Sequence, residues 1–85
     1  MNTNEAIRSL IATQDDKTLI GSLVILEAKT DLDDAEKMVR CFTIDALTVR
    51  HDVEDAADDI YMSDSFEGTQ TDALLAALAA KGVAA

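Results

Sequence analysis

A histidine followed by a cluster of carboxylates, just past the midpoint of the chain, holds the residue types best suited to chemistry. Four such residues recur at i, i+3, i+4 and i+7 of one helical strip: His51, Glu54, Asp55 and Asp58. Two strips of this kind, facing each other across a helix bundle, can hold metal ions through their carboxylates. The spacing therefore raises a metal site as the first hypothesis to weigh.

The rest of the chain does not supply the other parts of a catalytic site. The pair His51-Asp52 opens the ligand set of one class of metal-dependent phosphohydrolases, but that set needs further histidines and the chain has only one. Cys41 lies in an apolar stretch without a histidine close by, which is typical of a structural cysteine. The three glycines stand apart, so there is no glycine-rich phosphate loop. We therefore predict no catalytic residue, no metal site and no cofactor.

An enzyme stays open as an alternative because the acidic residues fall into two groups. This arrangement resembles all-α nucleotide pyrophosphohydrolases, which hold magnesium with carboxylates from two helices, and Mg²⁺ needs few carboxylates when phosphate oxygens complete its shell. The first group would be Asp31, Asp33, Asp34 and Glu36, and the second Glu54, Asp55 and Asp58. The first group also lies where a helix is expected to begin, a common place for acidic residues. A magnesium-dependent pyrophosphohydrolase is therefore the alternative function.

The second acidic group belongs to a longer run in which the sign of the charge never changes. Eight carboxylates and no lysine or arginine lie between Arg50 and Lys81, in a chain of net charge −10. Solvated helices usually mix charges of both signs, because pairs at i and i+4 stabilise them. The run is either a face that only keeps the protein in solution or a surface that another molecule binds.

A binding surface of this kind favours a basic protein as the partner. Side chains one helical turn apart lie about 5–6 Å from each other, comparable to successive phosphates along a nucleic-acid strand. We predict a non-enzymatic acidic interaction protein that binds a basic protein surface, and an inhibitor from a mobile element that mimics nucleic acid is one concrete form. The predicted partner-binding residues are Asp52, Glu54, Asp55, Asp58 and Asp59. A helical adaptor or assembly subunit is a further alternative.

Charge and composition also indicate where the protein acts. The excess of carboxylates repels nucleic acid and anionic lipid, so neither is an expected direct partner. The first residues lack the basic and apolar segments of a secretory signal, and the longest apolar stretch, 19–26, is too short to cross a bilayer. A single cysteine cannot form an internal disulfide. These observations predict a cytoplasmic protein.

The elements that position these residues are expected to be helices. The chain has no proline and only three glycines, and its apolar residues recur at helical spacing. We predict one all-α domain, 1–85, with four helices spanning about 4–12, 15–29, 31–62 and 70–81. Three Thr-x-x-Asp sequences, beginning at Thr13, Thr30 and Thr69, are interpreted as capping boxes at helix starts. The β-branched residues of 19–26 leave a strand open as the alternative there.

The third predicted helix carries an apolar seam with heptad spacing. From Leu32 to Ile60, apolar residues recur at alternating intervals of three and four, as in a coiled coil. A helix over 31–62 would be about 48 Å long at 1.5 Å per residue, which exceeds the width of a compact chain of this size. It must protrude, pair with a second copy, or break. We predict a homodimer, whose seam comprises Val39, Phe42, Ala46, Val49, Val53, Ala56 and Ile60.

Overall fold

The computed structural model describes residues 3–83, which form five helices and no strand. The helices are α1 (Thr3–Ala12), α2 (Asp16–Ala28), α3 (Asp34–His51), α4 (Glu54–Tyr61) and α5 (Gln70–Ala80). The predicted all-α class is confirmed, and the strand alternative for 19–26 is wrong because these residues lie inside α2. The helices predicted over 4–12, 15–29 and 70–81 match α1, α2 and α5 to within one residue at each end. None of the described helices is long and apolar enough to span a bilayer.

The single helix predicted over 31–62 is wrong, because the chain turns between α3 and α4. Asp52 adopts the left-handed conformation, with φ 52° and ψ 52°, and its amide donates to the carbonyl oxygen of Thr48. Aspartate enters this conformation more readily than most residues. The turn allows α4 to pack along α5 and places Val53 in the core, with none of its surface exposed. A straight helix of the predicted length would also exceed 42 Å, the longest dimension of the molecule.

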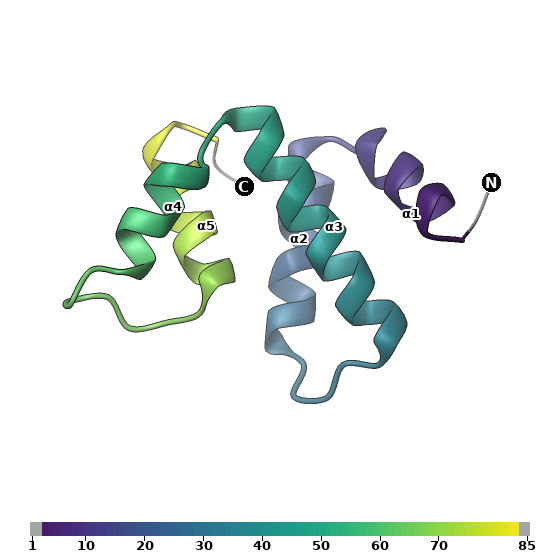
Figure 1. Cartoon of the computed structure of the whole chain (residues 1–85), viewed down its shortest axis with the longest axis horizontal. Helices are drawn as coiled ribbons and strands as arrows, with labels where there is room; N and C mark the ends of the chain where they lie inside the picture. The colour runs from purple at the N-terminus through teal and green to yellow at the C-terminus, as the bar shows by residue number, and fades with distance from the viewer. Residues whose placement is uncertain (1–2, 84–85) are drawn as a thin grey trace.

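Two groups of helices lie side by side (Figure 1). In the first, the three-helix group, α2 and α3 run antiparallel on either side of the loop 29–33, and α1 packs against α3. In the second, the hairpin, α4 and α5 pack against each other and are joined by the loop 62–69. α5 also contacts α2 and α3, so it holds the hairpin against the three-helix group.

A single apolar core joins the two groups. Leu23 of α2 and Leu47 of α3 are fully buried, and Leu78 of α5 is only 1% exposed. The hairpin residues in the same core are Val53, Leu74, Ala77 and Leu78. Burying one leucine side chain contributes about 1.5–3 kcal/mol, which is substantial for a chain this short. The hairpin therefore shares its apolar core with the three-helix group.

The helix starts use caps that the sequence only partly predicts. The capping box predicted at Thr69 is confirmed: its hydroxyl accepts from the amide of Asp72, and the Asp72 carboxylate accepts from the amide of Thr69. The other two boxes are wrong, because Asp15 instead of Thr13 caps α2, and Asp33 instead of Thr30 caps α3. Aspartate is at least as good an N-cap as threonine, so these caps follow the usual preference.

Candidate functional site

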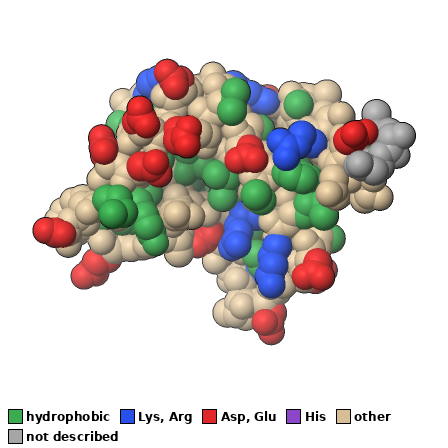
Figure 2. Space-filling model, viewed as in Figure 1, with side chains coloured by type: hydrophobic (Ala, Val, Ile, Leu, Met, Phe, Trp, Pro, Cys, Tyr) green, Lys and Arg blue, Asp and Glu red, His purple; other side chains and the backbone are tan. Residues whose placement is uncertain are grey.

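The five predicted partner-binding carboxylates lie on α4 and on the turn before it. Asp52, Glu54, Asp55, Asp58 and Asp59 are all exposed, and we refer to them as the acidic face. In Figure 2, acidic side chains gather over the part of the molecule that contains α4, whereas lysine and arginine side chains lie mostly over the three-helix group. The inward side of α4 is apolar and packs against the core. The hairpin therefore presents this cluster of carboxylates to solvent.

No lysine, arginine or histidine lies within ion-pair distance of the acidic face among residues 3–83. In the three-helix group, by contrast, three acidic side chains pair with basic ones: Asp45 lies 3.9 Å from Arg8, Glu36 pairs with Lys29, and Asp16 pairs with Arg50. Other exposed carboxylates of the described chain also have no ion pair, so what distinguishes the acidic face is that it gathers its unpaired carboxylates on one short segment.

Lys81 is the first basic residue after Arg50, yet it does not neutralise the acidic face. Its Nζ donates a hydrogen bond of 2.7 Å to the backbone carbonyl oxygen of His51, the last residue of α3. The last carbonyls of a helix have no partner within the helix, so this bond satisfies one of them. This hydrogen bond of Lys81 therefore links the end of α5 to the end of α3.

The structure separates His51 from the acidic strip with which its spacing aligned it. Its Nε2 lies 2.9 Å from Oδ1 of Asp16, an approach without the direction of a hydrogen bond. Arg50 donates a hydrogen bond of 2.9 Å to the same oxygen. These contacts, with His51 first and Arg50 second, lower the pKa of the Asp16 carboxyl below its ordinary value. The histidine therefore belongs to the contact between α2 and α3, and not to the acidic face.

The two acidic groups of the pyrophosphohydrolase alternative lie at opposite ends of α3. At its start, Asp33 and Glu36 bond to each other's backbone amides, and Glu36 also pairs with Lys29. The second group lies on α4, beyond the other end. α3 has 18 residues, so about 27 Å of helix separates the two groups. Among residues 3–83, no group of three or more His, Cys, Asp or Glu side chains is placed to hold a metal ion.

The α3 part of the predicted dimer seam lies beside α1. Val39, Phe42 and Ala46 are half-buried against the core, while Val49 is 81% exposed. Phe42, Ala46 and Val49 also line a hollow of about 360 Å³ between α1 and α3. The guanidinium of Arg8 lies over the Phe42 ring, 4.3 Å from its centroid, and so covers part of this apolar surface. We call these four α3 residues the α3 seam.

The turn at the end of α3 changes the remainder of the seam. Val53 is buried in the chain's own core, and Ile60 is half-buried against it. Ala56 is exposed, and its neighbour Ala57 takes the inward position instead. A straight helix would keep all these residues in line with the α3 seam, but the turn directs them toward α5.

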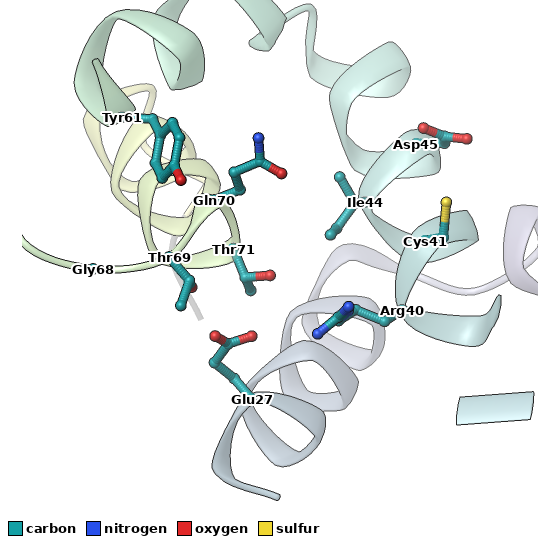
Figure 3. A pocket seen from close by; sticks show the side chains of 10 residues that line it. All are labelled: Glu27, Arg40, Cys41, Ile44, Asp45, Tyr61, Gly68, Thr69, Gln70 and Thr71. Carbon is teal, nitrogen blue, oxygen red and sulfur yellow. The ribbon is translucent and has the colours of Figure 1, made fainter. Parts of the chain in front are cut away.

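A cleft that the sequence analysis did not predict lies between the three-helix group and the hairpin (Figure 3). Its volume is about 530 Å³, and its walls come from α2, α3, α4 and the start of α5. Glu27 of α2 reaches toward it, and its Oε2 is shielded from solvent without a hydrogen-bond partner among residues 3–83. Arg40 of α3 lines the same cleft and pairs with no carboxylate of the described chain.

Two charged residues of this cleft, Glu27 and Arg40, lie at sequence positions where helical spacing predicts a buried side chain. Glu27 follows the buried Leu23 by four residues, so it shares the inward side of α2. Arg40 precedes the buried Thr43 and Leu47 by three and seven residues, so it shares the inward side of α3. A charged residue on a buried helix side requires a polar partner, and this requirement marks both positions.

The fold thus places four carboxylates of the acidic face on α4 and Asp52 on the turn before it, divides the dimer seam, and adds a cleft. Cys41, interpreted as structural, has an exposed thiol and lines that cleft. Comparison of the chain with protein-family models, with curated proteins and with solved structures finds no match.

Proposed function

We propose that the protein is a non-enzymatic interaction protein whose acidic face binds a basic surface of a partner protein. The observation that carries this proposal is the acidic face itself, five exposed carboxylates without a basic neighbour among residues 3–83. Like charges at i and i+4 destabilise an isolated helix by about 0.2–0.5 kcal/mol per pair. A basic partner would relieve this repulsion, so its binding is favoured by a strain that the free protein carries.

The distribution of charge along the whole chain supports the same kind of partner. Residues 52–85 contain eight acidic and one basic residue, a net charge of −7, whereas residues 1–51 contain nine acidic and six basic residues, a net charge of −3. A field concentrated at one end accelerates encounter with a cationic surface. Salt screens such a field over about 8–10 Å at ordinary concentrations, so association should weaken as salt is raised.

A protein that normally binds nucleic acid is the partner that suits this surface best. Carboxylates one helical turn apart on α4, such as Asp55 and Asp59, lie about 5–6 Å from each other, which is close to phosphate spacing. The protein would then act as a cytoplasmic inhibitor that occupies the basic cleft of a nucleic-acid-processing protein. An inhibitor carried by a mobile element is one form of such a protein.

The α3 seam supports pairing between two copies of the chain. Its exposed apolar surface centres on Val49, beside a hollow that an apolar side chain of another molecule could fill. A homodimer formed there would present two acidic faces to the partner. The adaptor alternative would use the same seam to hold a different protein.

The experiment that tests the acidic face compares two variants that lose the same charge. The face variant replaces four carboxylates with their amides, namely Glu54, Asp55, Asp58 and Asp59, and keeps Asp52 because it forms the turn. The control variant neutralises four exposed carboxylates elsewhere, namely Asp31, Asp34, Asp64 and Glu67. Proteins are captured from a host lysate by each variant at low and at high salt, and identified by mass spectrometry.

The face variant should lose its captured partner severalfold or more, as the wild type should at high salt, while the control variant keeps it. Circular dichroism should show unchanged helicity, because all four substituted side chains are exposed. If both variants capture the same proteins with the salt dependence of the wild type, the acidic face is only a solvated surface. The pyrophosphohydrolase alternative instead predicts magnesium-dependent nucleotide hydrolysis by the wild type, which the face variant would lose.

A further inference from the structure

The outer side of α2 is apolar and remains exposed in the described chain. Between Lys17 and Glu27 this helix carries no charged residue, so it is largely apolar all the way round. Its inner side packs into the core through residues such as Leu23. On its outer side, Val24 is 53% exposed and its neighbour Ile25 is 67% exposed. A helix that is apolar on every side is normally buried on every side, so the outer side of α2 points to a molecule that covers it.

The outward residues of this helix recur with the spacing of a coiled coil. Intervals of four, three, four and three separate Lys17, Gly21, Val24, Ala28 and Asp31, and we call these five residues the α2 strip. The first four lie on α2, and Asp31 follows in the loop 29–33. All of them are exposed except Gly21, which is half-buried. Such spacing keeps one side of a helix in contact with a second helix over several turns.

The α2 strip is complementary to itself when its direction is reversed. If two copies of α2 lie antiparallel with their Val24 side chains facing each other, the spacing places Gly21 of one copy against Ala28 of the other. Lys17 of each copy then lies beside Asp31 of the other, so the two-fold symmetry produces this pair twice. Neither Lys17 nor Asp31 forms an ion pair among residues 3–83. Parallel pairing would instead place like charges side by side, which favours the antiparallel arrangement.

We propose that the α2 strip binds the α2 strip of a second copy of this chain in antiparallel orientation. Val24 and Ile25 form the apolar centre of this interface, and a Lys17–Asp31 ion pair closes it at each end. A chain this short buries a modest fraction of its surface, so burial against a second copy adds to its stability. The inference goes beyond the proposed function, because it needs neither the acidic face nor a basic partner and uses a different helix from the α3 seam.

The dependence of this association on salt is opposite to that of the acidic face. Each copy carries a net charge of −10, so two copies repel each other at long range. Salt screens this repulsion and leaves the apolar contact intact, so pairing through the α2 strip should strengthen as salt is raised. Binding of a basic partner to the acidic face should weaken under the same change.

The test measures self-association of the wild type and of three variants by sedimentation equilibrium, at low and at high salt. Val24→Lys places two ammonium groups against each other at the centre of the interface. Leu10→Lys is the matched control, because Leu10 of α1 is 62% exposed and the change of charge is the same. Val49→Asp reports on the α3 seam. Thermal unfolding verifies that each variant folds, as expected because all three side chains are exposed.

The wild type should associate, and Val24→Lys should weaken this association at least about tenfold, since it would bury two facing charges. Leu10→Lys should associate as the wild type does, and Val49→Asp should keep the pairing through the α2 strip. The inference is overturned if the wild type stays monomeric at high salt and high protein concentration, or if Val24→Lys associates as strongly as the wild type. It is also overturned if Val49→Asp alone abolishes association, because the α3 seam would then join the copies.

A charge exchange tests the antiparallel arrangement. Lys17→Asp and Asp31→Lys should each weaken association severalfold, because each creates two pairs of like charges, and the double variant should restore it. If the double variant associates less than either single variant, the ends do not meet and the inference is overturned. A wild type that stays monomeric yet captures a basic partner would overturn this inference and leave the proposed function standing.

Discussion

The three-helix group and the hairpin share one core but use their acidic side chains differently. In the three-helix group, Asp15 and Asp33 cap helices, and Asp16 forms an ion pair with Arg50. On α4 and the turn before it, the carboxylates of the acidic face bond to no basic side chain among residues 3–83. One basic residue accompanies eight acidic residues after position 51, and it bonds to a backbone carbonyl.

This difference separates charges that stabilise the fold from charges that we propose bind another molecule. A capping aspartate contributes about 0.5–2 kcal/mol to the protein that carries it. An exposed carboxylate among like charges contributes nothing to that protein and slightly destabilises it. We therefore expect substitutions in the three-helix group to change stability, and substitutions on the acidic face to change binding.

The largest effect should come from the residue at which the two groups join. Val53→Asp places a carboxylate at a position with no exposed surface, so it should cost about 3–5 kcal/mol and unfold both groups together. Urea unfolding followed by circular dichroism measures this. Val49→Asp is the control, because Val49 is 81% exposed and the change should alter stability by only about 0.5 kcal/mol.

The same pair of variants bears on self-association. Sedimentation should show that Val49→Asp is monomeric where the wild type is dimeric, if the α3 seam joins two copies. A partial transition in Val53→Asp, with one group unfolded and the other intact, would contradict the single core that joins them.

Two glycines should show effects of opposite sign in the two groups. At Gly68, with φ +156°, an added Cβ would lie 2.9 Å from Oδ2 of Asp72, which bonds to the amide of Thr69 at the start of α5. Gly68→Ala should therefore destabilise the protein by about 1–3 kcal/mol. Gly21 lies inside α2 with open space around the position of a Cβ, so Gly21→Ala should stabilise by about 0.5–1 kcal/mol. Thermal unfolding of both variants measures the difference, and equal shifts would contradict this account.

The smallest effect concerns stability in acid, and it should arise in the three-helix group. The pKa of Asp16 is lowered from its ordinary value of 3.8, so the folded protein binds fewer protons than the unfolded chain as pH approaches that value. The stabilisation is complete above the ordinary pKa and is lost as pH falls through the lowered one. Asp16→Asn should lower the midpoint of thermal unfolding slightly at pH 6, and the gap to the wild type should close toward pH 3.

The acidic face offers the matched change. Asp58→Asn removes a carboxylate that has no basic neighbour in the described chain, so at pH 6 it should leave the midpoint unchanged or raise it slightly. A midpoint that falls as far as in Asp16→Asn would contradict the division of roles between the two groups.

Local spacing was enough to predict four of the five helix starts within a few residues, but not the turn after α3. The apolar interval of four from Val49 to Val53 suits a straight helix paired with another copy, and it also suits a turn that buries Val53. The turn is favoured by Leu74 and Leu78, more than 20 residues further along, which form part of the core that encloses Val53. Tertiary packing of this kind leaves no trace in a local pattern.

The same limit applies to the functional residues. The acidic face could be predicted because its members are neighbours in sequence, and all of them but Asp52 share one short helix. The cleft could not, since it requires Glu27, Arg40 and Tyr61, from three different helices, to line one space. The sequence does show a charged residue on an otherwise apolar helix side at Glu27 and at Arg40. This pattern identifies the two residues but does not show that they line the same cleft.

The left-handed turn at Asp52 also creates two helix ends within the most charged part of the chain. The peptide dipoles of a helix leave partial positive charge at its start and partial negative charge at its end. α3 ends with Arg50 and His51 in its last turn, and α4 begins with Glu54 and Asp55 in its first. Each favourable placement contributes about 0.3–1 kcal/mol, whereas a continuous helix would have put all four in its middle, where the dipoles cancel. By ending one helix and starting another, the chain gains a macrodipole that accommodates the first carboxylates of the acidic face.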